Sequence, residues 1–158
     1  MARVRGEILI NRPVEQVFDF VADQRNEPIY NPRMLQSEKI TAGPLGVGTR
    51  FRATARSGRR VVEMLIEITE YDRARSLGSR TTMSSVDVNG GLTFDPVDGA
   101  TRMSWSWEVS PKGPLRLVGP LVARLGRRQE QTIWTGLKAQ LEGPDPGRAR
   151  QSSDQDRG

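Results

Sequence analysis

The sequence of 158 residues contains no histidine and no cysteine. Without cysteine there are no disulfides, no thiol nucleophile and no thiolate metal ligands. Without histidine, Ser-His-Asp and Cys-His catalytic arrangements are excluded. A metal site made of carboxylates alone would need clustered acids, but the aspartates are scattered: Asp19, Asp23, Asp72, Asp87, Asp95 and Asp98. We therefore expect no metal and no cofactor.

Long apolar runs are also missing. No apolar stretch approaches the roughly 20 residues that span a bilayer. A secretion signal would have an apolar run after Met1–Arg5, but apolar and polar residues alternate there. These features predict a cytoplasmic protein with no membrane span. Residues 143–158 contain no large apolar side chain, so we expect a folded domain over residues 1–142 and a disordered tail over 143–158.

The net charge of +5 has two interpretations. It could indicate a nucleic-acid or anionic-membrane partner, or only solvated strand faces and a basic tail. The arginines are spread out, apart from clusters at residues 56–60 and 124–128, and no nucleic-acid-binding motif accompanies them. The glycines of residues 43–48 are not followed by Gly-Lys-Ser/Thr, which excludes a P-loop. We favour solvated faces and expect no specific nucleic-acid partner.

Residues 114–142 give the only long helical pattern. Apolar residues recur there at three- and four-residue steps, which indicates one apolar stripe: Leu117, Val118, Leu121, Val122, Leu125, Ile133, Trp134, Leu137 and Leu141. The polar residues, Glu130 among them, are expected largely on the other side. Pro120 should kink the helix or begin its main segment after Gly119.

The preceding residues predict strands and short helices. Alternation predicts strands at residues 4–10, 34–41, 49–56, 61–71 and 74–82, and a hairpin of 91–95 with 101–109. A short helix should follow Pro13, residues 23–32 should form a turn or a broken helix, and residues 83–89 should be irregular. In the first hairpin, Arg50, Arg52 and Arg56 can face Glu63 and Glu67.

These elements form an α+β fold, a curved antiparallel sheet of about seven strands around a long C-terminal helix. The apolar face of the sheet carries Phe51, Met64, Ile66, Phe94, Met103, Trp105 and Trp107. Because a curved sheet cannot touch the helix along its whole concave face, a cavity for a small apolar ligand is expected between them.

Several motifs, taken in order, resemble the START-like, or SRPBCC, superfamily with its helix-grip (START/Bet v 1-like) fold, and in particular its polyketide cyclase/dehydrase branch. They are Arg12-Pro-Val-Glu-Gln-Val-Phe18, Tyr30-Asn-Pro32, Gly46-Val-Gly-Thr-Arg-Phe51, Glu67-Ile-Thr-Glu-Tyr71, Gly91-Leu-Thr-Phe-Asp-Pro96, Gly99-Ala-Thr-Arg102 and Leu137-Lys-Ala-Gln-Leu-Glu142. The resemblance spans the chain except the tail. It implies either a carrier of a lipid, polyketide or aromatic ligand, or a cyclase that folds a poly-β-ketone.

The expected ligand-binding residues lie on the apolar sheet face, near Tyr30 and along the helix. They are Tyr30, Phe51, Met64, Ile66, Leu77, Ser79, Phe94, Met103, Trp105, Trp107, Leu117, Leu121 and Leu125. Trp105 and Trp107 could line the cavity or only fill the core, and Trp134 is expected in the core. Tyr30, Ser79, Thr81 and Arg80 are weak candidates for catalytic groups, because a place at the cavity mouth or on a solvated strand face explains each of them better. Arg80 should point outward.

The leading hypothesis is a non-enzymatic binder of a small hydrophobic molecule. The alternative is a metal-free polyketide cyclase/dehydratase, and an interaction module with a basic face is third. An acid–base role would require a carboxyl whose pKa is raised by burial, or a Tyr30 whose pKa is lowered by a neighbouring arginine. A monomer or weak homodimer is expected.

Overall fold

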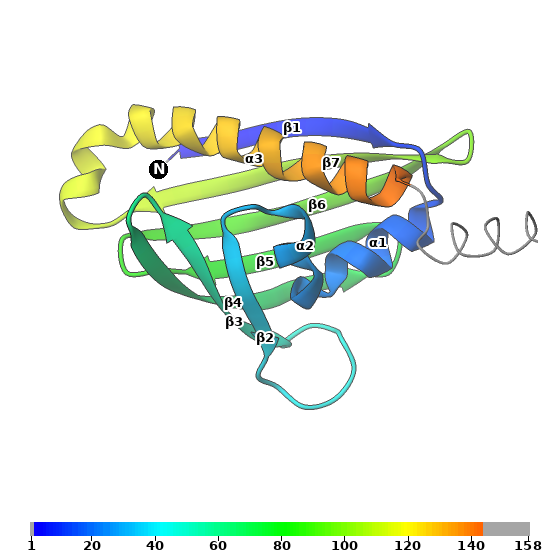
Figure 1. Ribbon diagram of the computed structural model, residues 1–158, viewed down its shortest axis with the longest axis horizontal. Coiled ribbons are helices and arrows are strands. Elements are labelled where there is room, and N and C mark those ends of the chain that lie inside the picture. Colours follow the sequence, from blue (N-terminus) through cyan, green and yellow to red (C-terminus); the bar gives the residue numbers. More distant parts are fainter. Residues whose placement is uncertain (1, 144–158) are drawn as a thin grey trace, which may run out of the picture.

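The computed structural model describes residues 2–143, and most of the tail expected at 143–158 lies outside the described residues. Seven antiparallel strands form one sheet in the order β1-β7-β6-β5-β4-β3-β2. Their bounds are β1 (Ala2–Ile10), β2 (Met34–Lys39), β3 (Arg50–Ser57), β4 (Arg60–Asp72), β5 (Ser76–Thr82), β6 (Val86–Val97) and β7 (Ala100–Pro111). The sheet curves around the helices (Figure 1).

The helices follow the expected order. They are α1 (Val14–Ala22), the 3-10 turn η1 (Gln24–Asn26), α2 (Glu27–Tyr30), the 3-10 segment η2 (Gly113–Val118) and α3 (Gly119–Glu142). Pro120 lies in the first turn of α3, where its missing N–H needs no partner. The helix α3 runs along β1 and contacts α2, while α1 packs against β6 and β7 (Figure 1). This is the helix-grip arrangement that the sequence predicts.

Strand register agrees with the sequence in both hairpins. Arg50 pairs with Glu67 and Arg52 approaches Glu63, each with a nitrogen–oxygen distance of 3.4 Å. In the second hairpin Leu92 lies opposite Trp105. These exposed arginines are thus partly explained by cross-strand charge pairs rather than by a ligand.

The irregular segment expected at residues 83–89 is confined to residues 83–85, and the expectation is wrong for residues 86–89. The β5–β6 turn is short, with the Met83 N–H donating to the Val86 carbonyl at 3.1 Å, and β6 already begins at Val86. Val88 pairs with Val109, whereas Asp87 forms an ion pair with Lys112 at 2.8 Å. The valines and the outward polar residues therefore alternate as in any half-buried strand. In the sequence, the high share of polar residues made this alternation hard to recognise.

The single apolar stripe expected along α3 is also wrong in its first half. Ile133, Trp134, Leu137 and Leu141 are buried, but Leu117, Leu121 and Leu125 have exposed fractions of 89, 55 and 57%. A residue advances about 100° around an α-helix, so each four-residue step overshoots a full turn by about 40°. Five such steps separate Leu121 from Leu141, which places them on roughly opposite faces.

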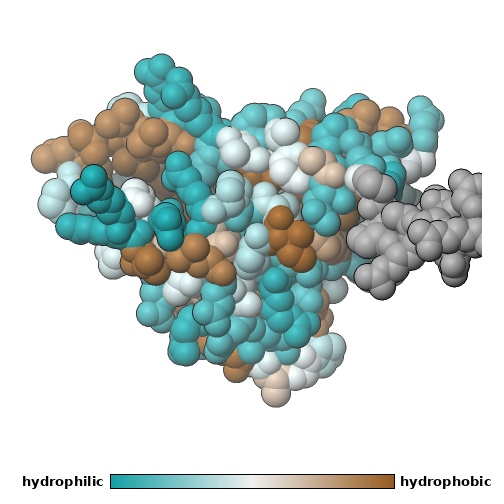
Figure 2. All heavy atoms as spheres, viewed as in Figure 1, coloured by the Kyte–Doolittle hydropathy of each residue, from teal (hydrophilic) through white to brown (hydrophobic). Residues whose placement is uncertain are grey.

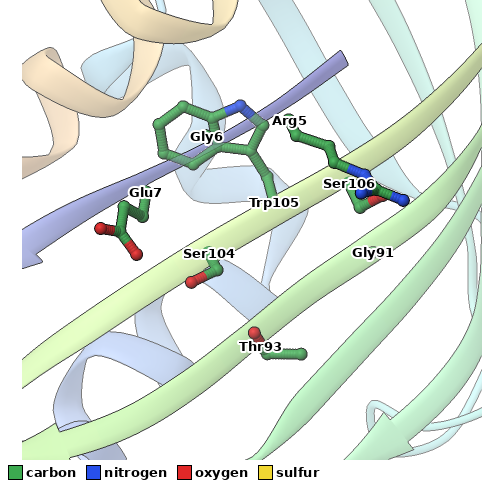
Figure 3. A pocket seen from close by; sticks show the side chains of 8 residues that line it. All are labelled: Arg5, Gly6, Glu7, Gly91, Thr93, Ser104, Trp105 and Ser106. Carbon is green, nitrogen blue, oxygen red and sulfur yellow. The ribbon is translucent and has the colours of Figure 1, made fainter. Parts of the chain in front are cut away.

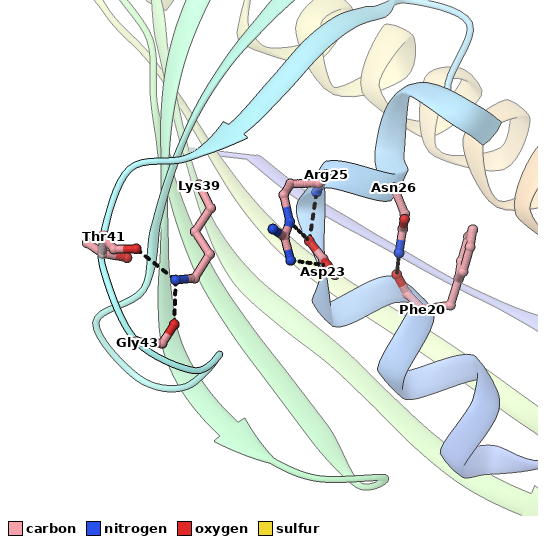
Figure 4. Close-up of polar contacts among 7 residues, drawn as sticks. All are labelled: Phe20, Asp23, Arg25, Asn26, Lys39, Thr41 and Gly43. Atoms are coloured by element: carbon pink, nitrogen blue, oxygen red, sulfur yellow. Dashed lines mark hydrogen bonds and ion pairs between the residues drawn. The ribbon is translucent and has the colours of Figure 1, made fainter.

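Polar contacts hold the segment between α1 and β2 in place (Figure 4). The Arg25 guanidinium donates to both oxygens of Asp23, at 2.8 and 2.7 Å, and the Asn26 amide donates to the Phe20 carbonyl at 3.0 Å. Lys39 donates to carbonyl groups of the following loop. The contacts of Asp23, Arg25 and Asn26 fix the start of α2, which carries the first residue of the site described below.

None of the helices within residues 2–143 has the length and apolarity that crossing a bilayer requires.

Candidate functional site: carboxylates beneath the long helix

Burial of the concave face changes along the strands. At the end near α1 and α2, the inward residues are fully buried, with Phe51, Ile68, Leu77, Phe94 and Met103 among them. Further along the same strands the inward residues are half-buried: Ala55, Val62, Met64, Ser79, Thr81, Val88 and Trp107. We call this second set the open half of the concave face. It is the part of the inner face on which a molecule could lie without displacing the core.

Aromatic side chains join the closed core to the helix above it. Trp134 of α3 lies between Trp105 and Tyr30, with ring centroids 6.1 Å from each. Gly136 allows this approach, because a Cβ there would collide with the Tyr30 carbonyl oxygen. Trp134 is buried in the core, as the sequence predicts.

Glu130 of α3 points into this aromatic group. Its Oε2 accepts hydrogen bonds from Trp107 Nε1 at 2.9 Å and from Trp134 Nε1 at 2.7 Å. Burial raises the pKa of Glu130, while the two indole donors act in the opposite direction by favouring the charged form. The expectation that Glu130 faces solvent is wrong, and the two indole N–H groups find their partner in this carboxyl.

Glu27 at the start of α2 is a second interior carboxyl. Its Oε1 accepts a hydrogen bond from Asn31 Nδ2 at 2.9 Å, and Asn31 itself is buried. The side chain keeps some accessible surface but is enclosed by protein atoms. Burial raises its pKa to about 7, the hydrogen bond from Asn31 opposes the rise, and the nearby Glu130 adds to it. Glu27 thus changes charge near neutral pH, where an acid–base group works best.

Tyr30 lies beside these acids, with only 5% of its surface exposed. Burial raises its pKa well above the usual value, and the charges of Glu27 and Glu130 raise it further. The possibility that a neighbouring arginine lowers the pKa of Tyr30 is therefore wrong. Tyr30 stays a neutral hydroxyl, able to donate or accept a hydrogen bond, and Glu27 is the group that titrates.

The site leaves polar atoms available for a ligand. Within residues 2–143, no protein donor reaches Glu27 Oε2, Glu130 Oε1 or the Tyr30 hydroxyl. The same part of the chain shows no ion pair to either carboxyl and no group of three potential metal ligands. The site is therefore acidic inside a protein with a basic surface, and it suits neutral or hydrogen-bond-donating groups.

The predicted site residues fall into three groups. Phe51, Ile66, Leu77, Phe94, Met103, Trp105 and Tyr30 are buried in the core. Met64, Ser79, Thr81 and Trp107 are half-buried on the inner face. Leu117, Leu121 and Leu125 are exposed, so the structure does not bring them to the others. Arg80 points outward, as expected, and donates to Asn89 Oδ1 at 3.2 Å.

Sequence reasoning missed both carboxyls, although a signal existed for each. Glu130 precedes Trp134 by four residues and Ile133 by three, so a helical projection places it on the buried face. Glu27 lies four residues before Asn31 within the Tyr30-Asn-Pro32 region, a spacing that allows a side-chain hydrogen bond over one turn. Both carboxyls lie close to arginines in the sequence, and this charged setting is typical of surface residues.

A surface hollow lies on the opposite, convex face. It has a volume of about 450 Å³, is open to solvent and lies between Arg5 and Glu7 of β1 (Figure 3). Its lining includes small residues such as Ser104, Ser106 and Gly91. Short side chains between two long ones produce such a depression, and it contains none of the interior acids.

Comparison with known proteins agrees with this fold. The family model described as polyketide cyclase/dehydrase and lipid transport matches residues 1–142. A Thermus thermophilus protein of solved structure is 22% identical, with a TM-score of 0.77 over 89% of this chain and 97% of its own. A START superfamily protein from Mycobacterium smegmatis is 13% identical, with a TM-score of 0.78 over 89% and 97%.

The Zhui aromatase/cyclase from Streptomyces sp. R1128 is also similar in structure, at 13% identity with a TM-score of 0.77 over 89% of this chain and 93% of its own. No curated protein sequence matches the chain. The structural likenesses establish the helix-grip fold, and the family match implies a hydrophobic-ligand-binding or cyclase role. The chain belongs to the polyketide cyclase/dehydrase and lipid transport family.

Proposed function

We propose that this protein binds a small hydrophobic molecule on the open half of the concave face, beneath α3. The observation that carries the proposal is the carboxyl of Glu130, which accepts hydrogen bonds from two tryptophans in a largely apolar interior and keeps one oxygen without a protein donor among residues 2–143. An apolar ligand body would lie on Met64 and Trp107, and its polar end would meet the free oxygens of Glu27, Tyr30 and Glu130. This acidic interior disfavours carboxylates and phosphates, whereas a hydroxyl end could donate to Glu27 or Glu130 and a keto end could accept from the Tyr30 hydroxyl.

A metal-free polyketide cyclase/dehydratase is the second candidate, favoured by the pKa of Glu27 near 7. Ionised Glu27 would remove a proton from a methylene between two carbonyls of a poly-β-ketone. The resulting carbanion would attack a second ketone, whose oxygen would take the proton back to give a β-hydroxy ketone. Loss of the hydroxyl as water would follow with a second proton from the same methylene, so no oxidant or cofactor is required.

A neutral fluorescent probe, N-phenyl-1-naphthylamine, tests the binding site. We expect micromolar affinity, about −8 kcal/mol, with energy transfer from tryptophan. Ser79→Leu would fill the open half and should weaken binding about tenfold or more, because the added side chain and the probe would occupy the same space. Ser106→Leu, on the convex face, is the matched control and should leave affinity unchanged. Equal effects of the two variants would place the probe elsewhere.

Turnover distinguishes the two candidates. The protein is mixed with a poly-β-ketone thioester, and cyclised product is followed by absorbance and mass spectrometry against buffer alone. For a cyclase, Glu27→Gln should abolish the excess product while probe binding persists. If the wild type produces no more than buffer while still binding the probe, the protein is a carrier.

A further inference from the structure

The end of η2 and the first half of α3 present apolar side chains to solvent. Leu117, Val118, Leu121 and Leu125 have exposed fractions of 89, 40, 55 and 57%. In Figure 2, apolar residues gather over the end of the molecule where η2 and α3 begin. Large apolar patches on a protein surface indicate an interaction site. We call residues 116–128 the leucine–arginine segment.

The inner side of this segment is already occupied by β1. Ala123 is buried, and a Cβ at Gly126 would lie 3.5 Å from Val4 Cγ2, an ordinary packing distance. Leu121 and Leu125 each lie about 160° around the helix from Ala123, on either side, so they point away from the sheet. The exposed leucines are thus not the roof of the interior site.

The charge of the segment is of one sign. Arg116, Arg124, Arg127 and Arg128 are exposed, and no acidic residue occurs between Lys112 and Gln129. Three- and four-residue spacings make Arg124 a neighbour of Leu121, and Arg128 a neighbour of both Leu125 and Arg124. Leucines flanked by arginines on one helix surface are typical of helices that lie in the interface of an anionic bilayer.

We propose that the leucine–arginine segment docks the protein on anionic lipid membranes, with the leucines inserted at the level of the headgroups and the arginines on lipid phosphates. Arginine stems suit this position, because they cover apolar surface while the charged head reaches the polar layer. A second copy of the chain is a less suitable partner for this segment, since the four arginines of one copy would face and repel the four arginines of the other. The proposal does not depend on what binds in the interior.

Vesicle flotation with the full chain tests the proposal. We expect binding to vesicles of phosphatidylcholine mixed with phosphatidylglycerol, and little binding to phosphatidylcholine alone. Leu121→Ser combined with Leu125→Ser should reduce partitioning about tenfold or more, because apolar burial contributes to interfacial binding. Arg124→Gln, Arg127→Gln and Arg128→Gln together should reduce it about a hundredfold.

Matched controls separate docking from general charge attraction. Arg56→Gln, Arg59→Gln and Arg60→Gln remove the same charge from the β3–β4 hairpin, and Leu9→Ser with Leu35→Ser removes two other exposed leucines. Both controls should retain binding. Equal losses in the controls, or no binding by the wild type, would overturn the proposal. Sedimentation velocity could instead show a dimer that only the Leu121→Ser/Leu125→Ser variant abolishes. That result would assign the patch to self-association and would also overturn the proposal.

A labelling experiment reads insertion directly. Because the chain has no cysteine, Leu121→Cys and, as control, Leu9→Cys each provide one thiol for an environment-sensitive nitrobenzoxadiazole dye. Anionic vesicles should shift the emission of the Leu121→Cys label to the blue and leave that of the Leu9→Cys label unchanged. No shift at Leu121→Cys, despite flotation, would show a purely electrostatic contact and refute insertion.

Discussion

Glu27 should make the stability of the protein fall as pH rises toward neutrality. Its carboxyl has a pKa of about 7 in the folded protein and 4.5 as an unperturbed group. Between these values the folded state binds more protons than the unfolded state, so the free energy of unfolding decreases with rising pH. A difference of about 2.5 pH units corresponds to roughly 3 kcal/mol, an upper value for this one group.

Other shifted carboxyls act in separable ways. Burial raises the pKa of Glu130 too, so it adds to the decrease with the same sign. Hydrogen bonds from Arg25 and Lys138 lower the pKa of Asp23 and Glu142. Those two groups lose their stabilising contribution as pH falls below their unperturbed pKa values. This pH range lies below the range in which Glu27 changes stability.

Urea unfolding between pH 4.5 and 8 measures the effect. The wild type should lose stability across this range, and Glu27→Gln should remove most of the loss, since the amide cannot ionise and its oxygen still accepts the hydrogen bond from Asn31. At pH 8 the variant should be more stable than the wild type by up to roughly 3 kcal/mol. Glu7→Gln, on the exposed face of β1, is the control of equal charge. If Glu27→Gln and the wild type follow the same pH profile, Glu27 is not the enclosed, titrating group described above.

Two further predictions compare matched positions on α3. Gly136→Ala should cost about 1–3 kcal/mol, because its Cβ would meet the Tyr30 carbonyl. Gly126→Ala should be neutral, or stabilising by up to about 1 kcal/mol through helix propensity. Thermal unfolding measures both variants, and a Gly126→Ala variant less stable than Gly136→Ala would contradict the close α2–α3 packing. Leu137→Ala should cost about 2–5 kcal/mol as a buried truncation, while Leu121→Ala should change the unfolding free energy by less than about 0.5 kcal/mol. A costly Leu121→Ala would mean that the leucine is covered in solution.

The sequence alone determined much of the fold. Alternation in residues 49–71 predicts the first hairpin, its inward face and its Arg–Glu pairs, because strand periodicity and cross-strand distance are local properties. The Leu92–Trp105 register followed in the same way from the turn at residues 96–99. Pro120 marked the start of α3 because its missing N–H is tolerated only in a first turn.

Only the tertiary structure decided which long-range partners meet. Leu121 and Leu137 look alike in the sequence, but the strand beneath the first half of α3 contacts another face of the helix. Glu130 looks like one more surface acid until Trp107, 23 residues earlier on another element, supplies a second indole donor. The role of Glu130 therefore depends on where the chain folds back. Burial raises the pKa of both Glu27 and Glu130, and it arises only when the strands and α3 enclose these side chains.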